Sequence, residues 1–153
     1  MHASVVYDTN YGNTRTVAQL IAKEWGNSTT VVSVSDLTTH MLEGVDVLVV
    51  GSPIIGWQPS ERMQAFLDSL TPGSLAGMRA AAFDTRVKFF IHGDAAGKIS
   101  DALGAAGATI FAHPQGFLVD GATGPLAAGE SRRAVAWAAF IGAELRASLA
   151  RSA

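Results

Sequence analysis

The sequence predicts an α/β fold: a doubly wound, five-stranded parallel sheet with helices on both faces. Two observations lead to this fold class. Short apolar runs alternate with segments of helical periodicity along the chain, which is the pattern of successive strand–helix units. In addition, 48% of the 153 residues are hydrophobic and only 16% are charged, as expected for a sheet that is covered on both faces. A chain of this length can bury one core, so we expect residues 1–153 to form a single domain.

The first half of the chain contains three predicted strands, which are Ala3–Tyr7, Thr30–Val34 and Val45–Val50. The second is rich in β-branched residues, and the third is apolar on both faces, as in a central parallel strand. Between the first two strands, apolar side chains at helical spacing predict a helix over Asn13–Trp25, which Gly26 ends. Asp36 is expected to cap a short helix through Met41–Leu42.

In the second half, Pro59 is expected to open a helix over Ser60–Leu70. Two runs compete for the fourth strand, Arg79–Phe83 and Val87–Ile91. We favour the first run because it leaves one loop, Asp84–Asp94, before the next predicted helix. The remaining predicted elements are a helix at Ala95–Ala106, a last strand at Thr109–Phe111 with a continuation at Phe117–Val119, and a final helix at about Gly129–Leu149.

The five strands are expected to pair in the order 2-1-3-4-5. Right-handed crossovers then bring the loops after the first, third and fourth strands together at the carboxyl edge of the sheet. In open α/β sheets a ligand binds at this edge, so the chemistry of these three loops decides the function.

The loop after the first strand has the sequence Thr9-Asn10-Tyr11-Gly12-Asn13-Thr14. A strand-to-helix turn directs backbone N–H groups and the positive end of the helix dipole at one point, and the hydroxyls here add further donors. Gly12 permits a positive φ or a close approach of the backbone. The segment contains no lysine, so it is not a P-loop of the G-x-x-x-x-G-K-[ST] type. We interpret it as a phosphate site built from neutral donors; alternatively, Asn13 or Thr14 only caps the following helix.

Thr9, Tyr11, Gly12 and Thr14 match every specified position of the pattern [ST]-x-[TY]-G-x-T, and this loop resembles the phosphate loop of flavodoxins. The resemblance covers essentially the whole chain, and no long insertion divides the last strand, so the protein is similar to short-chain flavodoxins. It implies a flavodoxin-like fold, an FMN cofactor and electron transfer. Asp8 departs from the family, in which a small residue often precedes the loop. Its carboxylate would be unfavourable beside a phosphate dianion unless the side chain turns away.

In flavodoxins the loop after the third strand covers one face of the isoalloxazine ring, and here this loop is Gly51–Pro59. The residues that the resemblance assigns to the cofactor are Ser52, Pro53, Ile54, Ile55, Gly56 and Trp57. Ile55 stands where the family commonly has an aromatic residue or Met. Gly56 stands where a family glycine can turn its peptide carbonyl towards the flavin, since glycine tolerates φ of either sign. Trp57 either forms a wall against the flavin or covers the helix after Pro59.

The loop after the fourth strand, Asp84–Asp94, corresponds to the one that binds the pyrimidine edge of the flavin in the family through backbone N–H groups. The residues that the resemblance assigns to the cofactor are Asp84, Thr85, Arg86 and Phe89. A cation at Arg86 near N1 and O2 would stabilise the anionic reduced flavin; alternatively, Arg86 pairs with Asp84. Phe89 or Phe90 supplies a stacking face or belongs to the core.

Other kinds of chemistry fit the sequence poorly. The chain has no cysteine, which excludes disulfides, thiolate metal sites and thiol nucleophiles. His2, His40, His92 and His113 lack the spacing that places two ligands on one helix face, so no metal site is expected. No G-x-S-x-G turn or ordered Ser/Asp/His set of a hydrolase is present. The formal net charge of −2 gives no strong field that would recruit nucleic acid or an anionic membrane.

We therefore expect an FMN-binding electron-transfer protein, a monomer or weak homodimer whose partner is a redox protein or a small quinone. We expect it to be cytoplasmic, because the first strand starts almost at Met1 and the longest apolar stretches are too short to span a bilayer. The first alternative is an FMN-dependent NAD(P)H:quinone or protoporphyrinogen-type oxidoreductase on the same fold. The second is a flavodoxin-like domain that binds no flavin and serves as an interaction module.

Overall fold

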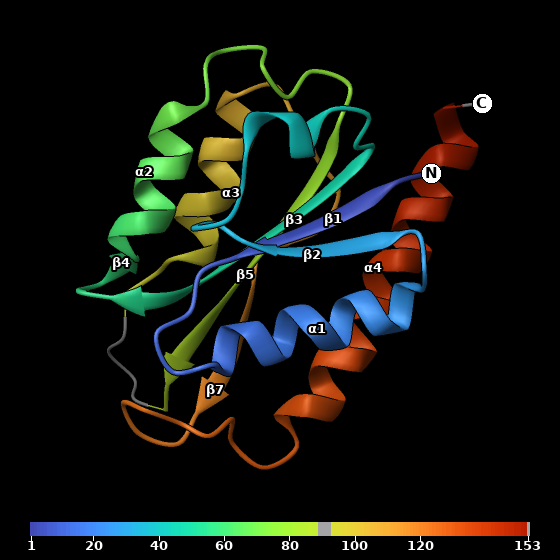
Figure 1. Cartoon of the computed structure of the whole chain (residues 1–153). Helices are drawn as coiled ribbons and strands as arrows, with labels where there is room; N and C mark the ends of the chain where they lie inside the picture. The colour runs from blue at the N-terminus through green and yellow to red at the C-terminus, as the bar shows by residue number, and fades with distance from the viewer. Residues whose placement is uncertain (89–92, 153) are drawn as a thin grey trace.

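The computed structural model describes residues 1–88 and 93–152. Its centre is a parallel sheet whose strands follow the order β2-β1-β3-β5-β6 (Figure 1). These strands are β1 (Ala3–Tyr7), β2 (Thr29–Ser33), β3 (Val47–Ile55), β5 (Arg79–Val87) and β6 (Thr109–Ile110). Two further strands lie off this order: β4 (Gln58–Pro59), which pairs antiparallel with β3, and β7 (Gln115–Val119), which pairs parallel with β5. The predicted order 2-1-3-4-5 is confirmed, with β5 as the fourth strand and β6 and β7 as two parts of the fifth.

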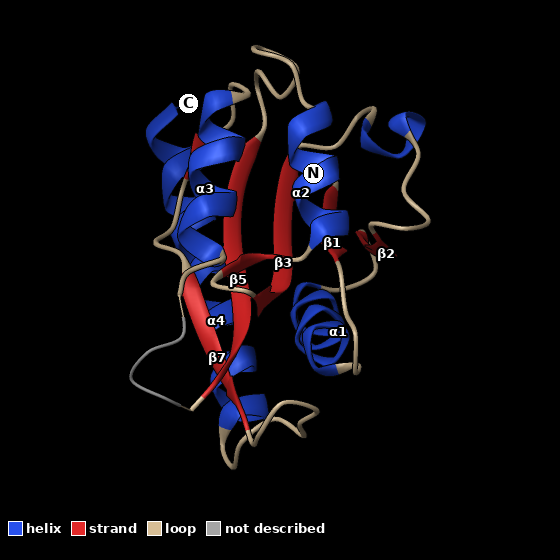
Figure 2. Ribbon diagram, turned by 90° about the vertical axis from the view of Figure 1, so that its left-hand side faces the viewer, coloured by secondary structure: helices blue, strands red, loops and turns tan. Residues whose placement is uncertain are grey.

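The helices cover both faces of the sheet. α1 (Asn13–Trp25) and α4 (Glu130–Ser152) pack on one face, whereas α2 (Glu61–Ser69) and α3 (Ala96–Ala105) pack on the other (Figures 1 and 2). A short 3₁₀ helix, Thr39–Leu42, follows β2. The predicted α/β architecture is therefore confirmed.

Side chains of the central strands alternate between two cores. Val49 of β3 and Phe83 of β5 belong to the core under α1 and α4, whereas Val50 belongs to the core under α2 and α3. This is the alternation expected of strands that are buried on both faces. The core under α1 and α4 also holds an aromatic cluster, in which the rings of Phe83, Phe117 and Trp137 meet edge to face.

Gly51 leaves the space that this aromatic cluster needs. Gly51 and Phe83 are opposite each other on β3 and β5. A Cβ atom at Gly51 would lie 2.1 Å from the ring of Phe83. The close approach of the ring, rather than an unusual backbone conformation, therefore requires glycine here.

Two segments that we expected to be loops are strand. β3 continues through residues 51–55 and β5 continues through residues 84–87, because the two strands keep pairing as far as Pro53 and Thr85. Both strands therefore extend beyond the end of β1, with β4 and β7 pairing along their last residues, and they carry predicted site residues on regular backbone.

The starts of two helices also differ from the prediction. Pro59 does not open α2 but pairs with Ile54 in the β3–β4 hairpin. Ser60 is the N-cap of α2, and its hydroxyl accepts a hydrogen bond from Met63 N at 3.2 Å. The cap assigned to Asp36 is wrong, because the 3₁₀ helix begins after Thr38.

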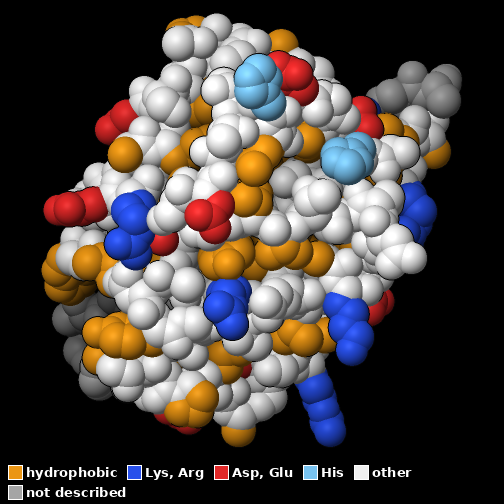
Figure 3. Space-filling view, viewed as in Figure 1, with side chains coloured by type: hydrophobic (Ala, Val, Ile, Leu, Met, Phe, Trp, Pro, Cys, Tyr) orange, Lys and Arg blue, Asp and Glu red, His pale blue; other side chains and the backbone are white. Residues whose placement is uncertain are grey.

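The surface carries charges of both signs. On the face seen in Figure 3, acidic and basic side chains are interspersed with apolar ones, in agreement with the small formal net charge of −2. Within residues 1–88 and 93–152, no helix combines the length and the apolar content needed to cross a membrane.

Candidate functional site

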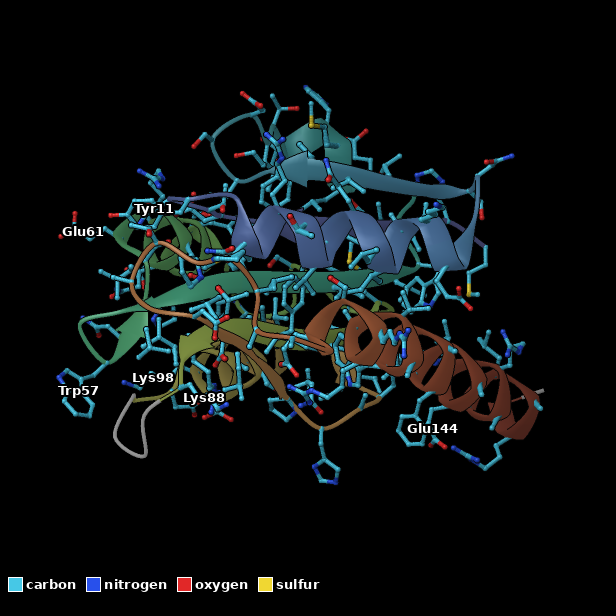
Figure 4. All side chains as sticks on the ribbon, turned by 90° about the horizontal axis from the view of Figure 1, so that it is seen from below. Tyr11, Trp57, Glu61, Lys88, Lys98 and Glu144 are labelled. Atoms are coloured by element: carbon cyan, nitrogen blue, oxygen red, sulfur yellow. The ribbon has the colours of Figure 1, made fainter. Side chains whose placement is uncertain are left out.

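The loop after β1 and the carboxyl ends of β3 and β5 meet in a cleft at this edge of the sheet. Its volume is about 390 Å³, counting the part that is open to solvent. In the described part of the chain, the lining residues are Thr9, Asn10, Tyr11, Asn13, Thr14, Pro53, Ile54, Ile55, Thr85, Val87, Val119 and Ala122. Figure 4 shows Tyr11 and Trp57 at this end of the molecule, far from Glu144 of α4. The structure thus brings predicted residues from all three loops together.

The turn from β1 to α1 has the geometry of an anion site. Gly12 is the N-cap of α1 and has a φ of 91°. Because glycine has no side chain, none caps the helix from this position. Thr9 Oγ1 accepts a hydrogen bond from Gly12 N at 2.9 Å, which closes the turn. The N–H groups in the first turn of a helix have no partner within the helix, and they lie at the positive end of its dipole.

Neither Asn13 nor Thr14 caps α1, contrary to the alternative interpretation of this loop. Asn13 Nδ2 donates to Thr123 O at 3.3 Å. The hydroxyls of Thr14 and Thr85 share a hydrogen bond of 2.8 Å, and both side chains are buried. This bond fixes the start of α1 against the end of β5, so two walls of the cleft are held at a set distance from each other.

Asp8 turns its carboxylate away from the cleft. The side chain is 2% exposed and accepts hydrogen bonds from Ser60 Oγ at 2.5 Å and from Arg62 Nε at 2.9 Å. Arg62 Nη2 also donates to Asn10 Oδ1 at 2.7 Å. Sequence reasoning missed Arg62. The available signal was Asp8 itself, because a buried carboxylate needs a charged partner and Arg62 follows the second loop at the same edge of the sheet.

Ser52 lies behind the second loop rather than among the lining residues. It is fully buried, and its hydroxyl donates to Pro53 O at 2.9 Å and accepts from Ser60 N at 3.0 Å. Ser52 therefore holds the start of α2 against the end of β3.

The second loop is a tight hairpin between β3 and β4. Ile55 pairs with Gln58, and the two residues between them, Gly56 and Trp57, have φ values of 57° and 74°. Positive φ at both central residues is typical of a type I′ turn, but it is unusual for a side chain as large as that of Trp57. Trp57 is 57% exposed at the tip, so Ile54 and Ile55 form the wall of the cleft here.

The start of α3 holds the hairpin tip in place. Trp57 O accepts hydrogen bonds from Asp94 N at 3.1 Å and from Lys98 Nζ at 3.5 Å. Gly93 packs so closely that a Cβ atom there would lie 2.4 Å from Trp57 Cα. These contacts with the backbone of Trp57 explain how this residue is kept in a strained conformation.

Arg86 pairs with Asp84, which is the second of the two roles that the sequence allowed. Arg86 Nη2 and Nε lie 2.6 and 2.7 Å from the carboxylate oxygens of Asp84, and this hydrogen bonding raises the pKa of Arg86. Asp84 is fully buried and also accepts hydrogen bonds from the backbone N–H groups of Ala95 and Ala96 at the start of α3. Neither Asp84 nor Arg86 is among the lining residues.

The cleft has a further wall that sequence reasoning missed. Val119 at the end of β7 and Ala122 beyond it line the cleft. Gly124 packs against Asn13, and a Cβ atom at Gly124 would lie 2.4 Å from the Asn13 side chain. The predicted continuation of the last strand at Phe117–Val119 could have indicated this wall, since it carries the chain past the loop over residues 9–14. Phe89 and Phe90, the predicted stacking residues of the third loop, lie outside the described residues.

Residues 4–88, more than half of the chain, match the family profile described as a flavodoxin domain. Among solved structures, the chain is similar to a flavodoxin from the domain Archaea, with a TM-score of 0.78 and 21% identity over 95% of this chain and 99% of that one. The chain is also similar to flavodoxin 2 from Bacillus cereus, with a TM-score of 0.77 and 18% identity over 94% of this chain and 99% of that one. For a short-chain flavodoxin associated with a non-canonical PDU bacterial microcompartment, the TM-score is 0.74 and the identity is 22%, over 92% of this chain and 97% of that one. Because the match to the family profile covers more than half of the chain and includes β1, the loop over residues 9–14, β3 and β5, the chain belongs to the flavodoxin family.

Proposed function

We propose that the protein binds FMN in the cleft and carries electrons between redox partners. One observation supports this most: the cleft joins the uncapped start of α1 and its neighbouring hydroxyls to an apolar wall of Ile54 and Ile55. A phosphate monoester attached to a flat aromatic ring needs both surfaces next to each other. Bound flavin accepts and releases the electrons, and the protein supplies binding, orientation and electrostatics.

The phosphate would be held by neutral groups. Thr9, Asn10, Asn13 and Thr14 line this part of the cleft, and the described lining residues carry no charge. Recognition would therefore rest on directed hydrogen bonds from hydroxyls, amides and the first turn of α1. Tyr11, which is 62% exposed, stands at the rim with its ring towards solvent.

The flavin ring would lie against the second and third loops. Ile54 and Ile55 offer an apolar face, and Thr85 and Val87 line the neighbouring side of the cleft. The hydrogen bond between Thr85 and Thr14 ties the part that would hold the ring to the part that would hold the phosphate. Both ends of one nucleotide would thus be bound by a single rigid frame.

Titration of the apo-protein with FMN and with riboflavin tests this proposal. FMN should saturate at one molecule per chain and raise the melting temperature. Riboflavin, which lacks the phosphate, should bind much more weakly. Saturating FMN that leaves both flavin fluorescence and melting temperature unchanged would refute flavin binding and favour an interaction module instead.

The combined substitution Thr9→Ala and Thr14→Ala tests the phosphate loop. It should weaken FMN binding by about 3 kcal/mol or more, because each hydrogen bond to a charged group contributes about 1.5–3 kcal/mol. Riboflavin binding should change little. Thr71→Ala is a matched control, since Thr71 is an exposed threonine outside the cleft lining, and it should leave both affinities unchanged.

A second candidate is an FMN-dependent oxidoreductase that passes electrons from NAD(P)H to a small quinone. The rim of the cleft favours this possibility, because Tyr11 and Ile55 line the cleft and both have large, well-exposed side chains. A flat aromatic acceptor would stack on such a surface. Steady NAD(P)H consumption with a quinone and no partner protein would support the enzyme; a requirement for a redox protein would support the carrier.

A further inference from the structure

An ion pair lies directly behind the phosphate loop, outside the lining of the cleft. Asp8 is 2% exposed at the end of β1, and the side chain of Arg62 in the first turn of α2 is 53% exposed. Arg62 Nε lies 2.9 and 3.1 Å from the two carboxylate oxygens. Its Nη2 donates to Thr9 O at 3.4 Å and to Asn10 Oδ1 at 2.7 Å. One guanidinium therefore contacts three successive residues, of which Thr9 and Asn10 line the cleft.

The same carboxylate connects the loop to α2. Ser60 Oγ donates to Asp8 while it accepts from Met63 N as the N-cap of α2. Figure 4 shows Tyr11 and Glu61, the neighbours of Asn10 and Arg62, at the same end of the molecule. The loop is thus fixed against α2 by hydrogen bonds that need no ligand.

The charge of Asp8 matters because its position is one residue before Thr9. A carboxylate there repels a phosphate dianion, and the repulsion is strong in a partly buried site. Arg62 cancels this charge at contact distance and also orients Asn10. We propose that Arg62 is a positioning residue that makes the loop selective for a dianionic phosphate monoester by neutralising Asp8. This inference rests on the proposed function, since FMN is the monoester in question.

The proposal predicts opposite effects for the two members of the pair. Arg62→Gln leaves the carboxylate of Asp8 uncompensated behind the loop, so FMN binding should weaken. Asp8→Asn leaves the guanidinium uncompensated beside Asn10, so FMN binding should strengthen. The double variant has neither charge and should bind FMN nearly as the wild type does. Each single change should alter Kd by about tenfold, the order expected for one unit charge acting on a dianion in a well-solvated, strongly screened site.

The test is a titration of the wild type and these three variants with FMN and with riboflavin. Riboflavin affinity should be the same in all four proteins, because riboflavin carries no phosphate. Arg62→Lys retains the charge and should keep FMN affinity close to the wild type. Glu61→Gln is a matched control, since it removes one negative charge from the adjacent, exposed residue and should change FMN affinity much less than Asp8→Asn.

The melting temperature of each apo-variant shows whether it is folded. If Asp8→Asn does not fold, the FMN affinities of Arg62→Gln and Arg62→Lys still test the proposal, because only Arg62→Gln loses the positive charge. Weaker binding of FMN and riboflavin alike, or equal losses in Arg62→Gln and Arg62→Lys, would overturn the proposal and leave FMN binding intact. A wild type that binds no FMN would instead refute the proposed function, and this inference with it.

Discussion

Thr14 of α1 and Thr85 of β5 share a buried hydrogen bond of 2.8 Å, and through it the start of α1 is attached to the end of β5. Thr85→Val keeps the shape of the side chain but removes this partner of the Thr14 hydroxyl. We expect the free energy of unfolding to fall by about 1–2 kcal/mol, the cost of an unsatisfied buried hydroxyl. Urea denaturation measures the loss.

The double variant Thr14→Val with Thr85→Val is the control for this effect. Two apolar groups of the same shape replace the pair, so the double variant should be more stable than the sum of the single losses predicts. Strictly additive losses would show that the two hydroxyls do not depend on each other.

Gly51→Ala should destabilise the fold by about 1–3 kcal/mol, the usual cost of overpacking a core. The added methyl group would lie 2.1 Å from the ring of Phe83, which is itself fully buried. Thermal unfolding measures the change. The double variant Gly51→Ala with Phe83→Leu should lose less free energy of unfolding than the two single variants lose together. Losses that simply add would contradict a clash between these residues.

Trp57→Gly should stabilise the protein by about 0.5–1 kcal/mol, because a residue other than glycine is strained at positive φ. The indole is 57% exposed, so its loss removes little burial. Gly56→Ala should instead destabilise the protein, because it places a side chain at another position of positive φ. A Cβ atom at Gly56 meets no other atom, so the loss would come from backbone strain and not from a clash. Thermal unfolding checks both. Destabilisation by Trp57→Gly would mean that contacts of the indole hold the hairpin.

Glu130→Gln should change how stability depends on pH. Hydrogen bonds from Arg133 lower the pKa of Glu130, and a bond from the backbone N–H of Leu118 adds to this. A lowered folded-state pKa contributes stability above the unfolded pKa, and this contribution is lost as pH falls through the folded pKa. The variant should be less stable by about 1–2 kcal/mol near neutral pH and no less stable once Glu130 is protonated. Urea denaturation of the wild type and the variant, from neutral pH down to the pH at which Glu130 is protonated, measures the difference in stability. A difference that stays the same at every pH would contradict the lowered pKa of Glu130.

Much of the fold could be predicted because each strand and helix has its own local pattern. The preference for Arg79–Phe83 as the fourth strand is confirmed, since β5 begins at Arg79. The carboxyl ends of β3 and β5 could not be predicted from local sequence. Gly51, Pro53 and Asp84 are poor strand formers, and they are strand residues because the partner strand continues beside them.

The candidate site divides in the same way. The turn from β1 to α1 could be singled out as a candidate phosphate loop because all of its hydroxyls lie within six consecutive residues. The pair of Asp8 and Arg62 spans 54 positions and depends on how α2 packs against the end of β1. Ala122 lines the cleft for a similar reason, since its place depends on where β7 ends. Such contacts follow from tertiary packing and leave no local pattern.

Along residues 1–88 and 93–152 the cleft is lined only by uncharged side chains, and this bears on how binding there should respond to salt. Counterions compete with a ligand for lysine and arginine side chains, but they compete weakly with amides and hydroxyls held in fixed directions. Asp8 and Arg62 add no net charge behind the loop. Retention of a bound nucleotide should therefore differ little between dilute buffer and concentrated salt.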